Sequence, residues 1–166
     1  MRPSTSDAPT PVVAPREYVR PPRLKKGDTI GIAAISRPVW PDKLAAGIAV
    51  LEARGYEVVC ASNLGKGQPG GMLAGSDEER ANGYRELLRN PDVDAIVFAT
   101  GGYGAGRILE RLDPRELIER PRIHLGGSDL TALFAYAAAH AGLTTFYGPM
   151  AAMAIPREPS SCGMKS

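Results

Sequence analysis

The sequence predicts an α/β domain built on a parallel sheet that helices cover on both faces. Short apolar runs alternate with segments of helical periodicity, and glycine or proline stands at several of the junctions. A continuous apolar run such as 29–35 is typical of a strand buried on both faces, which is the rule in parallel sheets. With 43% apolar residues, the 166-residue chain is long enough for one domain with a buried core. Right-handed crossovers are expected between its strands.

The individual elements follow from local signals. Five short apolar runs are expected as strands: 29–35, 56–61, 94–100, 122–126 and 144–147. Helical segments are expected between them, at 43–54, from the Ser76–Glu79 capping box to about Asn90, at 107–111, after Pro114, and at 129–141. Gly55 and Gly142 stand where the first and last of these helices should end.

The chain divides into three parts. Residues 1–22 are rich in proline and poor in apolar side chains, so we expect a disordered tail. Residues 23–155 form the predicted domain. Residues 156–166 have no regular pattern, and we expect an irregular tail that follows directly on the end of a domain.

Composition excludes several classes of function. The formal net charge is only +2 and basic residues are not clustered, so neither nucleic acid nor a membrane is an expected partner. The two cysteines, Cys60 and Cys162, lack metal-ligand spacing, and we expect no metal, no cofactor and no disulfide. With no secretory signal and no apolar run of membrane-spanning length, the prediction is a cytoplasmic protein.

Three loops should meet at one edge of the sheet, because ligands of parallel sheets bind beyond the carboxyl ends of the strands. These loops are 36–41, 101–106 and 127–129. In the last of them a strand runs into two glycines, then Ser128, then a helix, which is the pattern of a nucleophile elbow. The amide of Asp129, at the start of that helix, would then stabilise an oxyanion. The alternative is that Ser128 or Asp129 only caps the helix, since Leu130 stands where the elbow pattern has glycine.

The glycine-rich loop 101–106 also lies between a strand and a helix. Its amides could hold an anion, or Gly101 and Gly102 could supply the second amide of an oxyanion hole. The spacing is not that of a dinucleotide site, and no Gly-Lys-Ser or Gly-Lys-Thr follows it, so neither a Rossmann site nor a P-loop is predicted.

A general base for Ser128 is missing from the sequence pattern. The chain has two histidines. His124 lies inside a predicted strand and is expected to be packed against the sheet, and His140 lies near the far end of the following helix. Neither is well placed to take the Ser128 proton.

These segments together resemble the LD-carboxypeptidase family of serine peptidases. The resemblance runs from about Pro22 to Pro149. Its carriers, in chain order, are the segments 24–30 (LKKGDTI), 73–81 (LAGSDEERA), 94–96 (DAI), 101–104 (GGYG), 127–133 (GSDLTAL) and 148–149 (GP).

The resemblance implies the N-terminal nucleophile domain of a two-domain enzyme. That domain would be flavodoxin-like and related in shape to class I glutamine amidotransferases, and a second domain would supply the histidine and glutamate of a triad. Ser128 matches the family's nucleophile, and the amides of Asp129 and of the Gly101–Gly102 pair match its oxyanion hole. The family removes the terminal D-alanine from murein tetrapeptides in the cytoplasm during peptidoglycan recycling. A related branch hydrolyses microcin-type antibiotics, and full-length relatives can form homodimers.

The sequence departs from the family pattern in three places. Gly127 stands where an aromatic residue usually precedes the serine, and Thr100 stands where arginine often precedes the paired glycines. The chain also ends before a His/Glu domain, so we expect it to be weakly active or inactive by itself. Two other interpretations stay open: a non-catalytic domain that binds a peptide or an anion at the Gly101 and Ser128 loops, and a degraded gene product.

Overall fold

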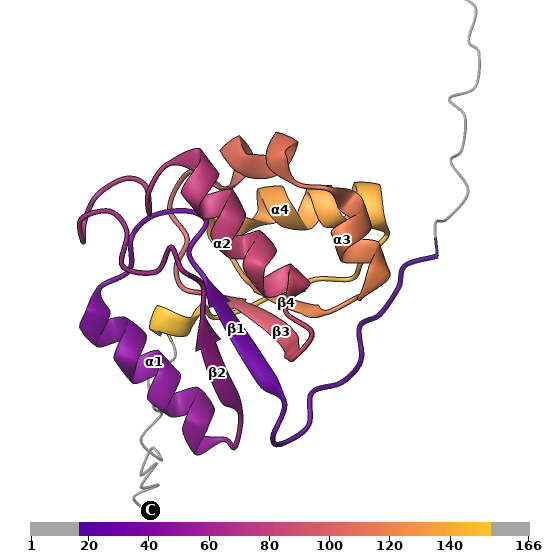
Figure 1. Ribbon diagram of the computed structural model, residues 1–166, viewed down its shortest axis with the longest axis horizontal. Coiled ribbons are helices and arrows are strands. Elements are labelled where there is room, and N and C mark those ends of the chain that lie inside the picture. Colours follow the sequence, from indigo (N-terminus) through magenta and orange to yellow (C-terminus); the bar gives the residue numbers. More distant parts are fainter. Residues whose placement is uncertain (1–16, 154–166) are drawn as a thin grey trace, which may run out of the picture.

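The computed structural model describes residues 17–153, and its centre is a five-stranded sheet (Figure 1). The strands are β1 (Thr29–Ala33), β2 (Glu57–Cys60), β3 (Val93–Phe98), β4 (Ile123–Gly126) and β5 (Phe146–Tyr147). They lie in the order β2-β1-β3-β4-β5, and every pair is parallel. The carboxyl ends of all five strands therefore meet at one edge, as the sequence predicts.

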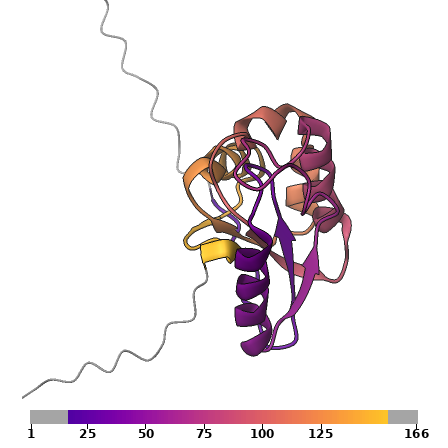
Figure 2. The ribbon, with the colours of Figure 1, turned by 90° about the vertical axis from the view of Figure 1, so that its left-hand side faces the viewer.

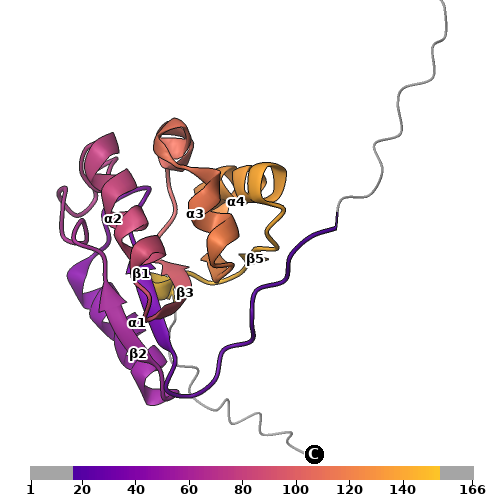
Figure 3. The same ribbon diagram turned by 45° about the vertical axis from the view of Figure 1, so that its right-hand side comes forward.

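The helices form a layer on each face of the sheet. α2 (Asp77–Arg89), α3 (Pro114–Glu119) and α4 (Thr131–Tyr136) lie side by side over one face, together with the 3₁₀ helix η1 (Ala105–Arg111) (Figure 3). The other face carries α1 (Pro41–Ala53), and the short 3₁₀ helix η4 (Ala151–Met153) lies against it (Figure 2). The prediction of an α/β domain with helices on both faces of a parallel sheet is confirmed.

Side chains of the central strands alternate between the two faces of the sheet, so the sheet contributes to two apolar cores. In β1, Ile30 and Ile32 point to the α1 face, and Ala33 points to the α2 face. Gly31 also faces α2, where a Cβ atom would lie 2.9 Å from a methyl carbon of Leu87. The absence of a side chain at this position lets α2 pack directly on the centre of the sheet.

Two predicted elements differ from the structure. The helix expected at 129–141 is a 3₁₀ turn (η2, Ser128–Leu130), then α4, then a π-helical turn (η3, Ala137–Ala141) that ends at the left-handed Gly142. The widened last turn lets the amide of Leu143 bond to the carbonyl of Ala137, 3.2 Å away. The segment expected as a helix at 107–111 is the 3₁₀ helix η1, and the last strand has only two residues.

Part of the predicted proline-rich tail belongs to the described chain. Val19 forms a parallel bridge with Leu143: its amide donates to the carbonyl of Gly142 (2.8 Å), and its carbonyl accepts from the amide of Thr144 (2.9 Å). Residues 1–16 and 156–166, the rest of the two predicted tails, lie outside the described residues. Among residues 17–153, no helix is both long enough and apolar enough to cross a membrane.

His124 is packed into the sheet, as predicted. It is 1% exposed on the face that α2 covers, and its ring lies edge-on to Tyr84. Its Nδ1 donates to the carbonyl of Arg122 (3.0 Å), so its Nε2 accepts from the hydroxyl of Tyr84 (2.8 Å). Burial lowers the pKa of His124 to about 4, because a charged imidazole would have to give up its hydration.

The buried histidine predicts a specific acid sensitivity. Between pH 6.5 and about 4 the unfolded chain binds a proton at His124 and the folded chain does not, so the free energy of unfolding falls as the pH falls through this window. The two pKa values correspond to a loss on the order of 3 kcal/mol. Urea unfolding across this pH range should show the decrease in the free energy of unfolding in wild type. The part of the decrease that comes from His124 should be absent in His124→Gln. His140→Gln, at an exposed position, should behave like wild type; equal pH dependence in all three proteins would contradict the prediction.

Candidate functional site

The carboxylate of Asp129 joins the three loops at the carboxyl edge of the sheet. Its Oδ2 accepts a hydrogen bond from the hydroxyl of Ser36 (2.7 Å), in the loop after β1. The same oxygen accepts from the amide of Ala105 (2.8 Å), at the end of the glycine-rich loop after β3. A weaker bond of 3.4 Å from the amide of Arg37 to the carbonyl of Gly101 links the first two loops directly. The three loops that the sequence predicts to meet are therefore joined by hydrogen bonds.

Ser128 has the backbone conformation of an elbow. Its φ of +57° makes it the one non-glycine residue between 17 and 153 with a positive φ, a conformation that costs an L-residue energy and is concentrated at functional sites. The turn before it packs closely against Tyr147: a Cβ atom at Gly127 would lie 3.1 Å from Cζ of that ring, so a side chain here would have to displace the exposed tyrosine. Ser128 itself is exposed.

Gly101 lies directly against the serine. A Cβ atom on Gly101 would be 3.1 Å from Cβ and 3.4 Å from Oγ of Ser128, so any side chain here would crowd the hydroxyl. Gly102 follows with a φ of +121°, and it lies against the side chain of Arg37. The structure thus brings together the residues singled out from sequence: Ser128, Asp129, Gly101 and Gly102.

The amides around Ser128 differ in their partners. The Ser128 amide donates to the hydroxyl of Tyr147 at 3.3 Å, and the Leu130 amide donates to the carbonyl of Gly127 at 3.3 Å. Asp129 lies in the first turn of the helical segment, where amides have no partner within the helix. Tyr147 was not indicated by the sequence, because nothing in its segment distinguishes it from an ordinary strand residue.

The side chain of Arg80 holds two of the loops of the site together. Arg80 lies in the first turn of α2, and its side chain is fully buried. Its guanidinium donates to the carbonyl of Gly104 (2.7 Å), to the carbonyl of Ile35 and to the carboxylate of Asp77. It therefore ties the end of β1 to the glycine-rich loop. A buried arginine with three such partners is costly to replace, because its removal leaves buried carbonyls unpaired.

Asp77 completes this support. Arg107 donates to both of its carboxylate oxygens, at 3.0 to 3.2 Å, so α2 is joined to η1. The hydrogen bond from Arg107, followed by that from Arg80, lowers the pKa of Asp77. The signal available in the sequence was the spacing of Asp77 and Arg80, three residues apart on one helix face.

Neither histidine is placed to act as a base for Ser128. Both ring nitrogens of His124 are engaged inside the sheet layer, with Tyr84 and Arg122. His140 lies in the π-helical turn η3, with its ring centre 4.7 Å from that of Tyr136. Among residues 17–153 there is also no cluster of three or more histidine, cysteine or acidic side chains that could hold a metal ion.

Fold and site together define a parallel α/β domain that presents a serine on a strained strand-to-helix turn, beside a glycine-rich loop. Comparison with known proteins agrees. The LD-carboxypeptidase N-terminal domain of peptidase family S66 matches residues 30–148, and the chain belongs to this family.

The relatives include cell-wall enzymes and an immunity protein. The chain is 40% identical over 131 residues to the "Probable murein peptide carboxypeptidase" of Bacillus subtilis (strain 168), covering 79% of this chain and 40% of that protein. It is 36% identical over 129 residues to the microcin C7 self-immunity protein MccF of Escherichia coli, covering 76% of this chain and 37% of that protein.

The fold is shared with solved structures of the same family. A structure of MccF in complex with glutamyl sulfamoyl guanosine superposes with a TM-score of 0.78 at 32% identity, covering 87% of this chain and 43% of the other. The chain thus spans about two fifths of the length of the relatives that it matches.

The two hydrogen bonds that the Asp129 carboxylate accepts predict a loss of folding stability when this side chain is truncated. Asp129→Ala leaves the hydroxyl of Ser36 and the amide of Ala105 without their acceptor, and charge-assisted hydrogen bonds of this kind contribute roughly 1.5–3 kcal/mol each. Asp129→Asn keeps an oxygen in the same place and should lose less. Urea unfolding at neutral pH measures the free energy of unfolding of both variants. An Asp129→Ala variant as stable as wild type would show that these hydrogen bonds do not stabilise the fold.

Proposed function

We propose that this chain is the nucleophile-bearing domain of a serine-type LD-carboxypeptidase that removes the terminal D-alanine from murein tetrapeptides during peptidoglycan recycling in the cytoplasm. The observation that carries the proposal is Ser128, exposed at a φ of +57° with Gly101 packed against it. A strained serine that merely capped a helix would have no need of an open face and a side-chain-free neighbour. The strand order 2-1-3-4-5 supports the flavodoxin-like, glutamine-amidotransferase-related form of the domain.

The proposed reaction is acyl transfer. Oγ of Ser128 attacks the carbonyl carbon of the residue before the terminal D-alanine, and the D-alanine amine leaves with a proton. The carbonyl oxygen gains negative charge, which the amides of Gly102 and Asp129 stabilise. Water then hydrolyses the acyl-serine. The proton of Ser128 needs an acceptor that neither His124 nor His140 provides, and a His/Glu domain beyond this chain is the proposed source.

One alternative substrate is favoured by a specific observation. The likeness to MccF, a microcin C7 self-immunity protein, extends over three quarters of the chain. A peptidyl-nucleotide would present the same kind of carbonyl to Ser128, so the attack is unchanged and only the leaving group differs. A non-catalytic domain that binds a peptide or an anion at the same loops is the remaining alternative.

A boronic acid tests the nucleophile without needing the missing base. Acetyl-L-boroalanine places boron where the carbonyl carbon would lie, and a serine hydroxyl adds to it at equilibrium, releasing its proton to solvent and leaving a tetrahedral borate that resembles the transition state. ¹¹B NMR should show this tetrahedral borate with wild type and not with Ser128→Ala. Ser62→Ala, at another exposed serine, is the matched control. A signal that persists in Ser128→Ala would count against the nucleophile.

Turnover by the isolated chain should be very low. Removal of the triad base typically lowers the rate by several orders of magnitude, about 10⁶-fold in a well-studied serine protease. Purified chain incubated with murein tetrapeptide should release D-alanine at a rate close to that of Ser128→Ala, measured by chromatography. Robust release that Ser128→Ala abolishes would mean that a base is present within the 166 residues.

A further inference from the structure

A cavity of about 200 Å³ opens beside the candidate oxyanion hole. Its wall includes two cations, Arg37 and Lys43, two exposed apolar side chains, Trp40 and Met153, and the polar Thr100. Thr100 directly precedes Gly101, which packs against Ser128, so the cavity adjoins the serine without containing it. The mechanism proposed above gives this cavity no role.

The charges in the cavity have no partners in the protein. Neither Arg37 nor Lys43 makes a side-chain hydrogen bond or ion pair with any residue between 17 and 153. The amino terminus of α1 begins at the same place, and its N-cap residue, Trp40, makes no capping hydrogen bond. The first turn therefore adds the positive end of a 13-residue helix. Asp42, the acid of that turn, does not line the cavity.

The position of Arg37 fits a carboxylate one residue beyond the scissile bond. A Cβ atom on Gly102 would lie 2.6 Å from Nε of Arg37, so the guanidinium lies against the glycine whose amide is proposed to hold the oxyanion. Consecutive Cα atoms of a peptide are about 3.8 Å apart. A terminal carboxylate that leaves with the last residue therefore lies within reach of a guanidinium that borders the oxyanion hole.

We propose that Arg37, assisted by Lys43, binds the free terminal carboxylate of the leaving residue, and that this cavity makes the enzyme a carboxypeptidase. The identification of the leaving residue rests on the function proposed above. The planar guanidinium can pair with both carboxylate oxygens, which a peptide that continues beyond this residue cannot offer. Trp40 and Met153 form an apolar wall that suits a side chain as small as a methyl group.

The fluorescence of Trp40 allows binding at this site to be measured. Trp40 is the single tryptophan of the protein, so its fluorescence reports on the cavity alone. Titration of wild type with N-acetyl-D-alanine should change the emission with a Kd in the millimolar range, as one charged contact would give. N-acetyl-D-alaninamide, which lacks the negative charge, should bind at least tenfold more weakly.

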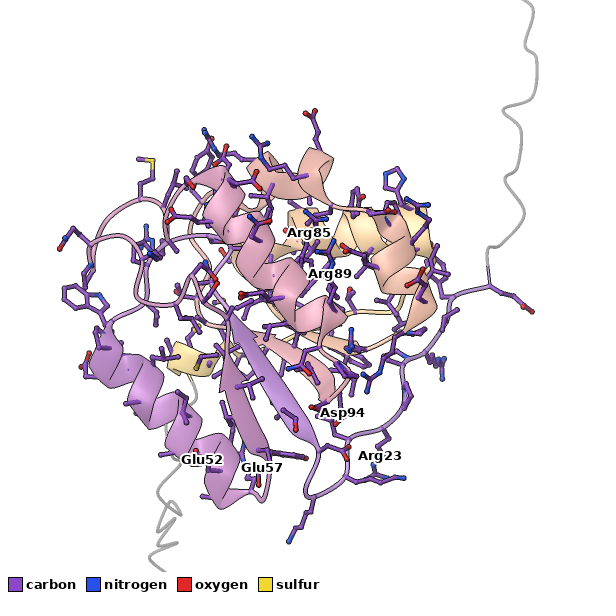
Figure 4. The ribbon with its side chains drawn as sticks, viewed as in Figure 1. Arg23, Glu52, Glu57, Arg85, Arg89 and Asp94 are labelled. Atoms are coloured by element: carbon purple, nitrogen blue, oxygen red, sulfur yellow. The ribbon has the colours of Figure 1, made fainter. Side chains whose placement is uncertain are left out.

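Substitution at Arg37 tests the assignment. Arg37→Gln should weaken binding of N-acetyl-D-alanine at least tenfold, and Arg37→Lys should restore part of the loss. Arg23→Gln is the matched control, since Arg23 is also exposed and unpaired among the described residues but lines a different cavity, together with Asp94, where β1 and β3 begin (Figure 4). It should bind as wild type does, and circular dichroism should confirm that all variants are folded.

The proposal is wrong if Arg37→Gln binds the acid as wild type does, if the amide binds as well as the acid, or if Trp40 does not respond up to roughly 100 mM acid, far above the expected Kd. The test is separate from that of the nucleophile. Acetyl-L-boroalanine has no terminal carboxylate, so Arg37→Gln should still form the borate that Ser128→Ala loses. A response of Trp40 that depends on Arg37, without any borate, would keep the carboxylate site and reject the proposed role of Ser128.

Discussion

The carboxylate of Asp129 is the interaction on which the rest of the site depends. One oxygen holds the hydroxyl of Ser36 and the amide of Ala105, and so connects the loops that follow β1, β3 and β4. These loops belong to strands that are neighbours in the sheet but distant in the chain. Without this acceptor, the loop after β4 would lose its side-chain hydrogen bonds to the other two loops. The residue next to the strained serine is thus also the residue that holds the surrounding loops together, which couples the proposed nucleophile to its proposed oxyanion hole.

The buried side chain of Arg80, paired with Asp77, also holds the loops after β1 and β3 in place. Arg80 is fully buried and bonds the carbonyls of Ile35 and Gly104, one from each side of the site. Its own charge is balanced by Asp77, which Arg107 also engages. Removal of one partner from a buried pair of this kind is strongly destabilising, because the other charge is left uncompensated. Here the pair fixes the glycine-rich loop, whose backbone is the part that the proposed chemistry uses.

Much of the fold could be predicted from sequence, because it depends on local patterns. Apolar runs, the capping box at Ser76 and the glycines at helix ends gave the parallel sheet, its helices and the edge where the loops meet. The π-helical turn before Gly142 was not predictable, since the apolar pattern of 129–141 indicates a helix but not which carbonyl each amide bonds. The ion pair between Asp77 and Arg107 was not predictable either, because the two residues are thirty positions apart in the chain.

The candidate site was predictable in its backbone and not in its side chains. Glycines and a serine at a strand-to-helix turn have a signature in the sequence, so Ser128, Asp129, Gly101 and Gly102 could be named. The carboxylate role of Asp129, the buried position of Arg80 and the bond from Ser128 to Tyr147 depend on contacts across the sheet edge. His124 was correctly expected to be packed into the sheet, because its position in a strand already implied burial.

The proposed function requires that the three loops form one catalytic surface, with Ser128 as nucleophile and the amides of Gly102 and Asp129 as oxyanion hole. A crystal structure of the acetyl-L-boroalanine adduct tests this most directly. We expect a bond from boron to Oγ of Ser128, with one borate oxygen within about 2.7–3.1 Å of both amide nitrogens. Boron attached to another residue, or a borate whose oxygens all point into solvent, would contradict it.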